Sequence, residues 1–177
     1  MDDGAADATA EDAPVSEPDL AHGVPVSSSG GQVVLHPSRE EYADLVARLR
    51  GEGYWVCLDL CGVDYLTYDP PRDLPAGIEP QRFEVVAELV DPTQRQRLRI
   101  RVQVPAEDPT VASIVAVHPG VDAHEREVFD LFGIDFEGHP HLTRILLPDE
   151  WVGHPLRKDE PVGSIPVQFK ATREEQR

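Results

Sequence analysis

Residues 83–104 read FEVVAELVDPTQRQRLRIRVQV, two runs of alternating side chains separated by a proline-containing turn. The apolar positions are Phe83, Val85, Ala87 and Leu89 in the first run, and Leu98, Ile100, Val102 and Val104 in the second. A period of two places one set of side chains on each face of a strand, and two such runs joined by a short turn are typical of a β-hairpin. The stretch therefore predicts two antiparallel strands with one buried face.

The same stretch also suggests how the two strands pair. A turn over residues 91–94, with Val90 opposite Arg95, sets apolar side chains against each other on one face and opposite charges on the other. The predicted pairs are Val85 with Ile100, Phe83 with Val102, Glu84 with Arg101, and Glu88 with Arg97. Rather than an anion-binding stripe, we interpret Arg97, Arg99 and Arg101 as a solvated outer face neutralised by the facing glutamates.

Two helices are predicted around this hairpin. Ser38 and Glu41 have the spacing of a capping box, and the apolar residues that follow at helical spacing predict a helix over 39–50 that stops at Gly51. Asp122 is a candidate N-cap with Glu125 three residues on, and Gly133 is a candidate stop, so a second helix should cover 122–132. Its expected buried stripe consists of Val128, Leu131 and Phe132.

The remaining segments complete an α+β pattern. Residues 54–61 alternate like a strand, whereas residues 66–81 contain four prolines and predict an irregular loop. Residues 1–31 hold seven acidic residues and no Lys or Arg, which predicts a disordered acidic tail. Residues 32–137 are the predicted α+β domain, with helices on a small, mainly antiparallel sheet.

Residues 138–177 predict an extended C-terminal arm. Prolines at 140, 148, 155, 161 and 166 exclude long helices and central strands there. The arm nevertheless carries the apolar residues Leu142, Ile145, Leu146, Leu147, Trp151 and Val152. Such residues need a surface to cover them, and that surface belongs either to this domain or to another protein.

Composition excludes several classes of function. The formal net charge of −17 argues against nucleic acid and anionic lipid as partners. No apolar run approaches the roughly 20 residues of a membrane-spanning helix, and no secretory signal is evident at the start. The two cysteines, Cys57 and Cys61, are too far apart on one strand for a disulfide and lack the CxxC spacing. We interpret them as half-buried strand residues of a protein in the reducing cytoplasm.

Charged and imidazole groups concentrate in residues 124–160, which raises the question of an active site. The H-E-x-x-H spacing of a zinc hydrolase is absent because Val128 occupies the second histidine position. His139 and His141 flank Pro140, which points their rings apart. Neither a G-x-S-x-G turn nor a phosphate-binding glycine loop is present. An ion-paired helix face is the simpler interpretation.

Four motifs in this region resemble a known family. They are EREVFDLFGI at 125–134, GHP at 138–140, RILL at 144–147 and GHPLRKD at 153–159. Together with DLCGVDY at 59–65 and the hairpin, they are similar to the family of the thirty-kilodalton subunit of respiratory complex I, the bacterial NADH-quinone oxidoreductase, over residues 35–162. The chain departs from the usual pattern at His118, Ala123 and Thr143, where aromatic or basic residues are common in that family.

The resemblance implies a two-layer α+β fold and a scaffold role without an active site. It implies that no cofactor or metal is bound here, while FMN, iron–sulfur clusters, NADH and quinone are bound elsewhere in the complex. The implied partners are the forty-nine-kilodalton-type subunit, which helps form the quinone pocket, and neighbouring iron–sulfur subunits of the peripheral arm of the complex. Membrane association, on the cytoplasmic face of the cell membrane, would come only through the complex.

The residues expected to carry this role lie in the shared motifs. Arg126 is expected to be held by Glu125 and Glu127, and Arg144, Trp151, Arg157 and Lys158 are expected to anchor the C-terminal arm to a partner. Asp130, His139 and His154 complete the signature. One alternative is the equivalent subunit of a membrane-bound hydrogenase or non-NADH dehydrogenase. Another is a free-standing hydrolase that uses Glu125 or Glu127 with His139.

Overall fold

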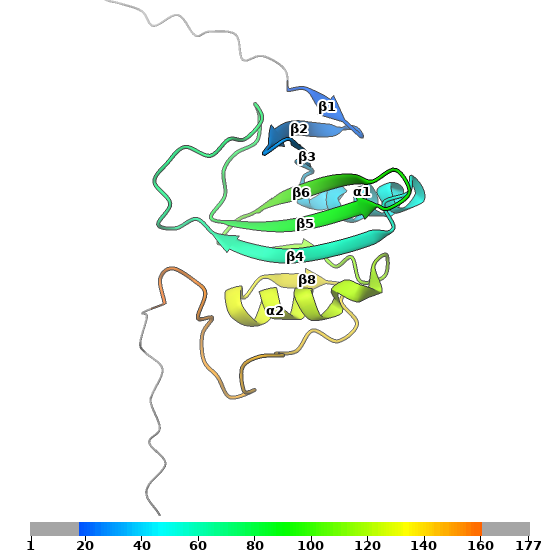
Figure 1. Ribbon diagram of the computed structural model, residues 1–177. Coiled ribbons are helices and arrows are strands. Elements are labelled where there is room, and N and C mark those ends of the chain that lie inside the picture. Colours follow the sequence, from blue (N-terminus) through cyan, green and yellow to red (C-terminus); the bar gives the residue numbers. More distant parts are fainter. Residues whose placement is uncertain (1–17, 161–177) are drawn as a thin grey trace, which may run out of the picture.

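The computed structural model describes residues 18–160, which form a six-stranded sheet with the order β1-β2-β3-β6-β5-β4 (Figure 1). Neighbouring strands are antiparallel except β3 and β6, which run parallel. The strands are β1 (Leu20–Ala21), β2 (Val24–Ser29), β3 (Gln32–Leu35), β4 (Val56–Asp64), β5 (Phe83–Asp91) and β6 (Gln96–Val104).

Two helices and a second, two-stranded sheet pack on one face of this sheet. The helices are α1 (Arg39–Gly51) and α2 (Asp122–Phe132), and the 3₁₀ turn η1 (Pro119–Val121) leads into α2. The small sheet pairs β7 (Thr110–Ala112) with β8 (Asp135–Glu137) in parallel. In Figure 1, α1 lies behind the large sheet and α2 lies below β4. The predicted two-layer α+β fold is confirmed.

The core forms between the helices and what we call the inner face of the sheet. Val85, Ala87, Ile100 and Val102 line this face and are each at most 1% exposed. The capping box of Ser38 and Glu41 is present, as predicted, and α1 buries Tyr42, Leu45, Val46 and Leu49. The helix ends one residue later than predicted, because Gly51 is its last residue and Glu52 is its C-cap. Its apolar spacing and its cap thus point to the same element.

Gly62 of β4 explains how closely α2 approaches the sheet. A Cβ atom at this position would lie 3.0 Å from side-chain atoms of both Val128 and Phe132. Any side chain there would have to push α2 away, so the close contact needs glycine. Gly62 pairs with Val85, which places α2 on the inner face.

The hairpin of β5 and β6 is confirmed, but its predicted register is wrong by two residues. Asp91 pairs with Gln96, so Val85 faces Val102 and Ala87 faces Ile100. The loop is therefore residues 92–95. It is closed by the Asp91 carboxylate, which accepts from Thr93 N at 2.8 Å and Gln94 N at 3.0 Å, and by a φ of +56° at Arg95. A shift of two residues keeps every side chain on its predicted face.

The charge pairs change with the register, and one of them is buried. Glu84 faces Gln103 but still reaches Arg101 diagonally, with Nε to Oε1 at 2.7 Å, whereas Glu88 contacts Arg99 instead of Arg97. Glu84 is only 1% exposed. The interpretation of this face as merely solvated is therefore wrong at Glu84, where loop residues 65–82 bring further groups onto the sheet.

The segment boundaries also differ from the prediction. Residues 20–29 form strands β1 and β2, so a disordered tail reaching residue 31 is wrong; residues 1–17 lie outside the described residues. From Gly138 to Glu160 the chain has no helix or strand, as predicted, and residues 161–177 of the C-terminal arm lie outside the described part. Among residues 18–160, no helix is long and apolar enough to cross a bilayer.

Candidate docking site on helix α2 and the C-terminal arm

Helix α2 begins differently from the prediction. Asp122 is its first residue and not its N-cap, because η1 runs directly into α2 and Val121 N already donates to His118 O at 3.0 Å. Glu125 turns inward. Its carboxylate is fully buried and accepts from Ser113 Oγ at 2.6 Å and Ile114 N at 2.8 Å. Burial raises the pKa of Glu125 above its usual value. Glu125 therefore ties α2 to the segment that follows β7.

The other end of α2 holds the C-terminal arm. Gly133 ends the helix in the left-handed conformation, as predicted, with φ +67°. Arg157 donates from Nε to Phe132 O at 2.6 Å and from Nη2 to Gly133 O at 3.3 Å. The last carbonyl groups of a helix carry partial negative charge, so an arginine is well placed there. A Cβ at Gly133 would come within 2.8 Å of both His154 and Arg157.

Asp130 is the centre of the contact between α2 and the C-terminal arm. Its carboxylate is fully buried, and Oδ2 accepts from three successive backbone N–H groups of residues 145–147 at 2.8 to 3.0 Å. Oδ1 accepts from Arg144 Nη1 at 2.6 Å. Burial alone would raise the pKa of Asp130, but these donors outweigh it and hold the pKa below its usual value. Asp130 thus stays charged and fixes the path of the arm.

Arg126 contributes to the same contact, though not as predicted. Its Nε donates to Thr143 O at 3.1 Å, and its Nη2 donates to Thr143 Oγ1 at 3.1 Å and Arg144 O at 3.2 Å. The prediction that Glu125 and Glu127 hold the Arg126 guanidinium is wrong. Glu125 is buried against Ser113, and Glu127 is exposed. Arg126 binds backbone carbonyl groups of the arm instead.

We call the side chains that join α2 to the arm the arm clasp; they are Arg126, Asp130, Thr143, Arg144, His154 and Arg157. Arg144 also donates to Gly153 O at 3.2 Å, and His154 Nδ1 lies 3.0 Å from Asp130 O. The guanidinium groups of Arg144 and Arg157 are thus engaged within the chain. In this structure Arg144 and Arg157 fix the arm to α2, and their direct contact with a partner stays a prediction.

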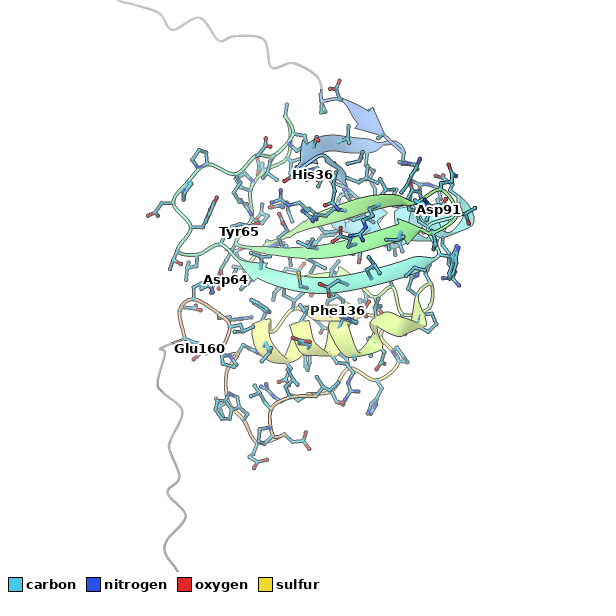
Figure 2. All side chains as sticks on the ribbon, in the orientation of Figure 1. His36, Asp64, Tyr65, Asp91, Phe136 and Glu160 are labelled. Atoms are coloured by element: carbon cyan, nitrogen blue, oxygen red, sulfur yellow. The ribbon has the colours of Figure 1, made fainter. Side chains whose placement is uncertain are left out.

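The end of the described arm is tied to the large sheet. Lys158 N donates to Asp64 Oδ2 at 2.8 Å, and Arg82 bridges Asp64 and Asp159 at 2.9 and 2.6 Å. Asp64 closes β4, and Figure 2 shows it near Glu160, at the opposite end of the sheet from Asp91. The arm is thus held at both its start and its end. The contact of Lys158 comes from its backbone.

With its backbone turned toward α2, the arm presents apolar side chains outward. Ile145, Leu146, Val152 and Leu156 are exposed by 40, 60, 92 and 44%. We call these four residues the arm patch; Trp151 is also partly exposed. Exposed aliphatic residues grouped on one ordered segment are typical of a protein-binding surface.

The groups suggested for a hydrolase meet, but in a closed place. His139 Nε2 lies 4.0 Å from Glu125 Oε2 and 3.5 Å from Asp122 Oδ1, and the side chains of His139 and Glu125 are fully buried. His139 Nδ1 accepts from His141 N at 3.0 Å, so its proton sits on Nε2. Glu127, the other acid of the hydrolase hypothesis, is exposed. Within residues 18–160, no three His, Cys, Asp or Glu side chains converge on a metal-sized site.

The cysteines are free thiols on β4, with Cys57 half-buried and Cys61 exposed. Burial raises the pKa of Cys57 to about 11, and partial desolvation together with the charge of Asp59 raises that of Cys61. Both are therefore protonated at neutral pH, which makes them poor nucleophiles and metal ligands.

This α+β domain holds an extended arm against a charged helix, and the arm carries exposed aliphatic side chains. These are the features of a docking subunit. The chain belongs to the family of the 30 kDa subunit of respiratory-chain NADH dehydrogenase, whose family model matches residues 35–165. The family resemblance seen in the sequence motifs is thereby confirmed.

Curated relatives carry names that agree with this family. The chain is 41% identical over 143 residues to the C subunit of NADH-quinone oxidoreductase from Salinispora arenicola, which covers 79% of this chain and 54% of that protein. It is 40% identical over 165 residues to NADH-quinone oxidoreductase subunit 5 of Thermus thermophilus, covering 90% and 76%. The chain spans about half the length of the Salinispora relative.

Solved structures agree with the fold. A trypsin-resistant fragment (1–134) of Nqo5 matches with a TM-score of 0.60 and 39% identity, covering 68% of this chain and 90% of the fragment. A chain of the membrane-bound sulfane sulfur reductase, an archaeal respiratory membrane complex, matches with a TM-score of 0.57 and 16% identity over 94% of this chain and 93% of that chain. The second likeness shows the fold alone.

Proposed function

We propose that this chain is a non-catalytic scaffold subunit of a proton-pumping NADH:quinone oxidoreductase. In this role it docks against the forty-nine-kilodalton-type subunit beside the quinone site and binds neighbouring iron–sulfur subunits of the peripheral arm of the complex, on the cytoplasmic face of the membrane. Family membership supports the parent complex. The arm patch, held out by the arm clasp, is the observation that supports docking.

The arm clasp explains how a segment without helix or strand can bind well. A disordered segment loses conformational entropy when it binds, and that loss weakens the complex. Here Asp130 accepts three backbone N–H groups and one guanidinium, so residues 144–147 are already fixed before a partner arrives. The apolar side chains of the arm patch can then be buried at little further entropic cost.

The proposal leaves electron transfer to the other subunits. FMN and iron–sulfur clusters bound elsewhere in the complex carry electrons from NADH to quinone. Of the groups that could have supplied acid–base chemistry, the side chains of Glu125 and His139 are fully buried, and Glu125 ties α2 to the segment after β7, whereas Glu127 is exposed. This chain accordingly contributes to turnover only by keeping its partners assembled.

Co-purification tests the docking step. A tagged chain isolated from detergent-solubilised membranes should bring down the forty-nine-kilodalton-type subunit. The double variant Leu146→Asp, Val152→Asp should reduce that recovery at least tenfold, because it places charges in a buried interface. Leu66→Asp is the matched control, since Leu66 is 50% exposed on the loop after β4. Normal assembly of the double variant would contradict the proposal. The recovered subunits also distinguish complex I from a hydrogenase or another dehydrogenase.

Turnover per assembled complex tests the scaffold role. Glu127→Gln and His139→Ala should lower quinone reductase activity only as far as they lower the amount of complex on native gels. Loss of an acid–base catalyst would instead reduce the rate about 10²–10⁴-fold without loss of assembly. A fully assembled His139→Ala complex with hundredfold slower turnover would therefore refute the scaffold role.

A further inference from the structure

The large sheet has a second face, which carries no helix among residues 18–160. Residues of β4, β5 and β6 alternate, so those opposite to the core point to what we call the outer face. A hollow of about 280 Å³ lies on this face, lined by Ser29, Val34, Val63, Tyr65, Glu84, Val86, Arg99 and Arg101. Three valines give it an apolar floor, and Tyr65, labelled in Figure 2, comes from the start of the loop after β4.

The two arginines of this hollow differ in what they already bind. Arg101 is engaged, with its Nε 2.7 Å from Glu84 Oε1 and its Nη2 3.2 Å from the Tyr65 hydroxyl. Arg99 lies 3.7 Å from Glu88 and makes no side-chain hydrogen bond within the described residues; its side chain is 32% exposed. Arg97, which precedes it on the same face of β6, is exposed. An incompletely paired guanidinium thus stands beside an apolar floor.

From this arrangement we infer that the outer face binds an extended segment of a neighbouring subunit, one that presents an aliphatic side chain two positions from an Asp or Glu, so that both side chains point to the same side of the segment. The aliphatic group fills the floor of Val34, Val63 and Val86, and the carboxylate meets Arg99 in a bidentate pair. Complementary charge beside a small apolar centre is the usual composition of such an interface. The inference goes beyond the proposed function, which uses the arm that is joined to α2 on the inner face.

The apolar surface continues beyond the hollow, which suits a polypeptide better than a small molecule. On β4, Cys61 is exposed, and Val56 of β4 and the facing Val90 of β5 are partly exposed. A segment that crosses the sheet can cover these side chains together, whereas a ligand the size of the hollow cannot.

The chain's own ends fit this surface less well than another subunit does. Residues 1–17 contain six acidic residues but only Met1 and Val15 as large apolar side chains. Residues 161–177 contain Val162, Ile165, Val167 and Phe169, but their three bases exceed their two acids. Residues 161–177 have no Leu, Ile or Val two positions from an Asp or Glu of their own, and residues 1–17 have one such pair, Val15 and Glu17.

Photo-crosslinking from the floor of the hollow identifies the occupant. Val86 is replaced by benzoylphenylalanine in the full chain, the complex is assembled and purified, and the crosslinked peptides are sequenced by mass spectrometry. The expected peptide belongs to another subunit and has Asp or Glu two positions from Leu, Ile or Val. Crosslinks to either end of this chain, to a second copy or to lipid, or no crosslink at all, would overturn the inference.

A native thiol gives a test that does not alter the hollow. In a Cys57→Ser chain, Cys61 is the sole cysteine and lies on the outer face opposite Val86. Its alkylation by a maleimide should be at least tenfold slower in the assembled complex than in the isolated chain. Denaturing the complex restores full labelling and serves as the control. Equal rates in complex and isolated chain would overturn the inference.

Charge reversal then tests the role of Arg99. Arg99→Glu should lower incorporation into the complex at least fivefold, whereas Arg95→Glu, at the exposed hairpin turn, should leave it within twofold. Equal incorporation of the two variants would count against a carboxylate partner at Arg99.

If the arm-patch variant loses its partner while Val86 gives no crosslink, the outer-face inference fails and the proposed function stands. If Val86 crosslinks as expected while the arm-patch variant assembles normally, the inference stands and the docking proposal fails.

Discussion

Two carboxylates that the sequence marks only as charged residues organise the structure of this protein. Asp130 and Glu84 are 0 and 1% exposed, and each accepts several donors that come from distant parts of the chain. A buried carboxylate is stable only when its oxygens are satisfied, so each one fixes the position of all the groups that donate to it. Replacing either of them should therefore lower the free energy of unfolding more than replacing one of the many exposed acidic residues.

Asp130→Asn should lower the free energy of unfolding by about 2–4 kcal/mol, because Arg144 loses its buried counter-charge and the amide cannot accept every N–H of residues 145–147. Urea unfolding at neutral pH measures the change. Asp135→Asn, on the exposed side of β8, is the control and should stay within about 0.5 kcal/mol. A cost below about 1 kcal/mol at Asp130 would show that the arm clasp contributes little to stability.

Glu84→Gln should lower the free energy of unfolding by about 3 kcal/mol, because it breaks a buried ion pair. Glu88→Gln should lower it by less than about 1 kcal/mol, because the Glu88–Arg99 pair is partly exposed and 3.7 Å apart. Exchanging the charges of Glu84 and Arg101 together should recover only part of the loss. Tyr65 and Gln103 donate to the carboxylate of Glu84 and would face a guanidinium after the exchange. Full recovery in urea unfolding would contradict this account.

His36 gives the protein a predictable sensitivity to mild acid. Burial, reinforced by the Arg101 guanidinium, lowers its pKa from 6.5 to about 4. Between these two values the unfolded chain binds a proton that the folded chain excludes, so stability falls as the pH drops below 6.5. The expected loss between pH 7 and pH 5 is about 2 kcal/mol from this residue. In His36→Gln, whose amide can still contact Ser27, the slope of unfolding free energy against pH should be smaller; an unchanged slope would exclude His36 as its source.

At the scale of elements, the C-terminal arm is attached to a domain that is complete without it. Strand β8 and the residue before it contribute Phe136 and Ile134, which are 1 and 0% exposed, whereas the chain after Gly138 has no helix or strand in its described part. The core therefore ends at β8.

Truncation after Gly138 should leave a folded, soluble domain that recovers at least tenfold less of the forty-nine-kilodalton-type subunit in co-purification. Truncation after Gly133 is the informative comparison: it removes β8 and two core side chains, and losing each such side chain costs about 2–5 kcal/mol, so this shorter chain should not fold. Circular dichroism and native gels measure the two outcomes. A shorter chain as stable as the longer one would mean that β8 is not part of the core.

At the scale of the whole molecule, the acidic N-terminus separates into two parts. Strands β1 and β2 extend the large sheet, and Val24 in β2 is only 2% exposed. Residues 1–17 hold six acids and no Lys or Arg, with Met1 and Val15 as their only large apolar side chains, and they lie outside the described residues.

Deleting residues 1–17 should leave assembly and NADH:quinone activity of membranes near normal. Deleting residues 1–31 should instead destabilise the chain, since it removes β1, β2 and the Ser27 hydroxyl that contacts His36. Native gels of both deletions provide the comparison. Loss of the assembled complex on the shorter deletion would show that residues 1–17 have a structural role.

The sequence alone was sufficient wherever the information is local or periodic. The capping box at Ser38, the stop at Gly133 and the alternation in β5 and β6 each depend on residues within a few positions, and all three are present. The family motifs of residues 125–159 were readable for the same reason, although the motif does not say what each residue contacts.

Tertiary structure decided the register of the hairpin, the burial of Glu84 and Glu125, and the direction in which Arg144 and Arg157 point. The register depends on a positive φ at Arg95, a conformation that an arginine adopts without any sequence signal. Asp130 and Arg126 bind backbone N–H and C=O groups 15 to 18 residues away, and every residue other than proline has both groups. Contacts to backbone leave no pattern of side chains to read, so only the folded chain reveals that the family signature holds its own arm.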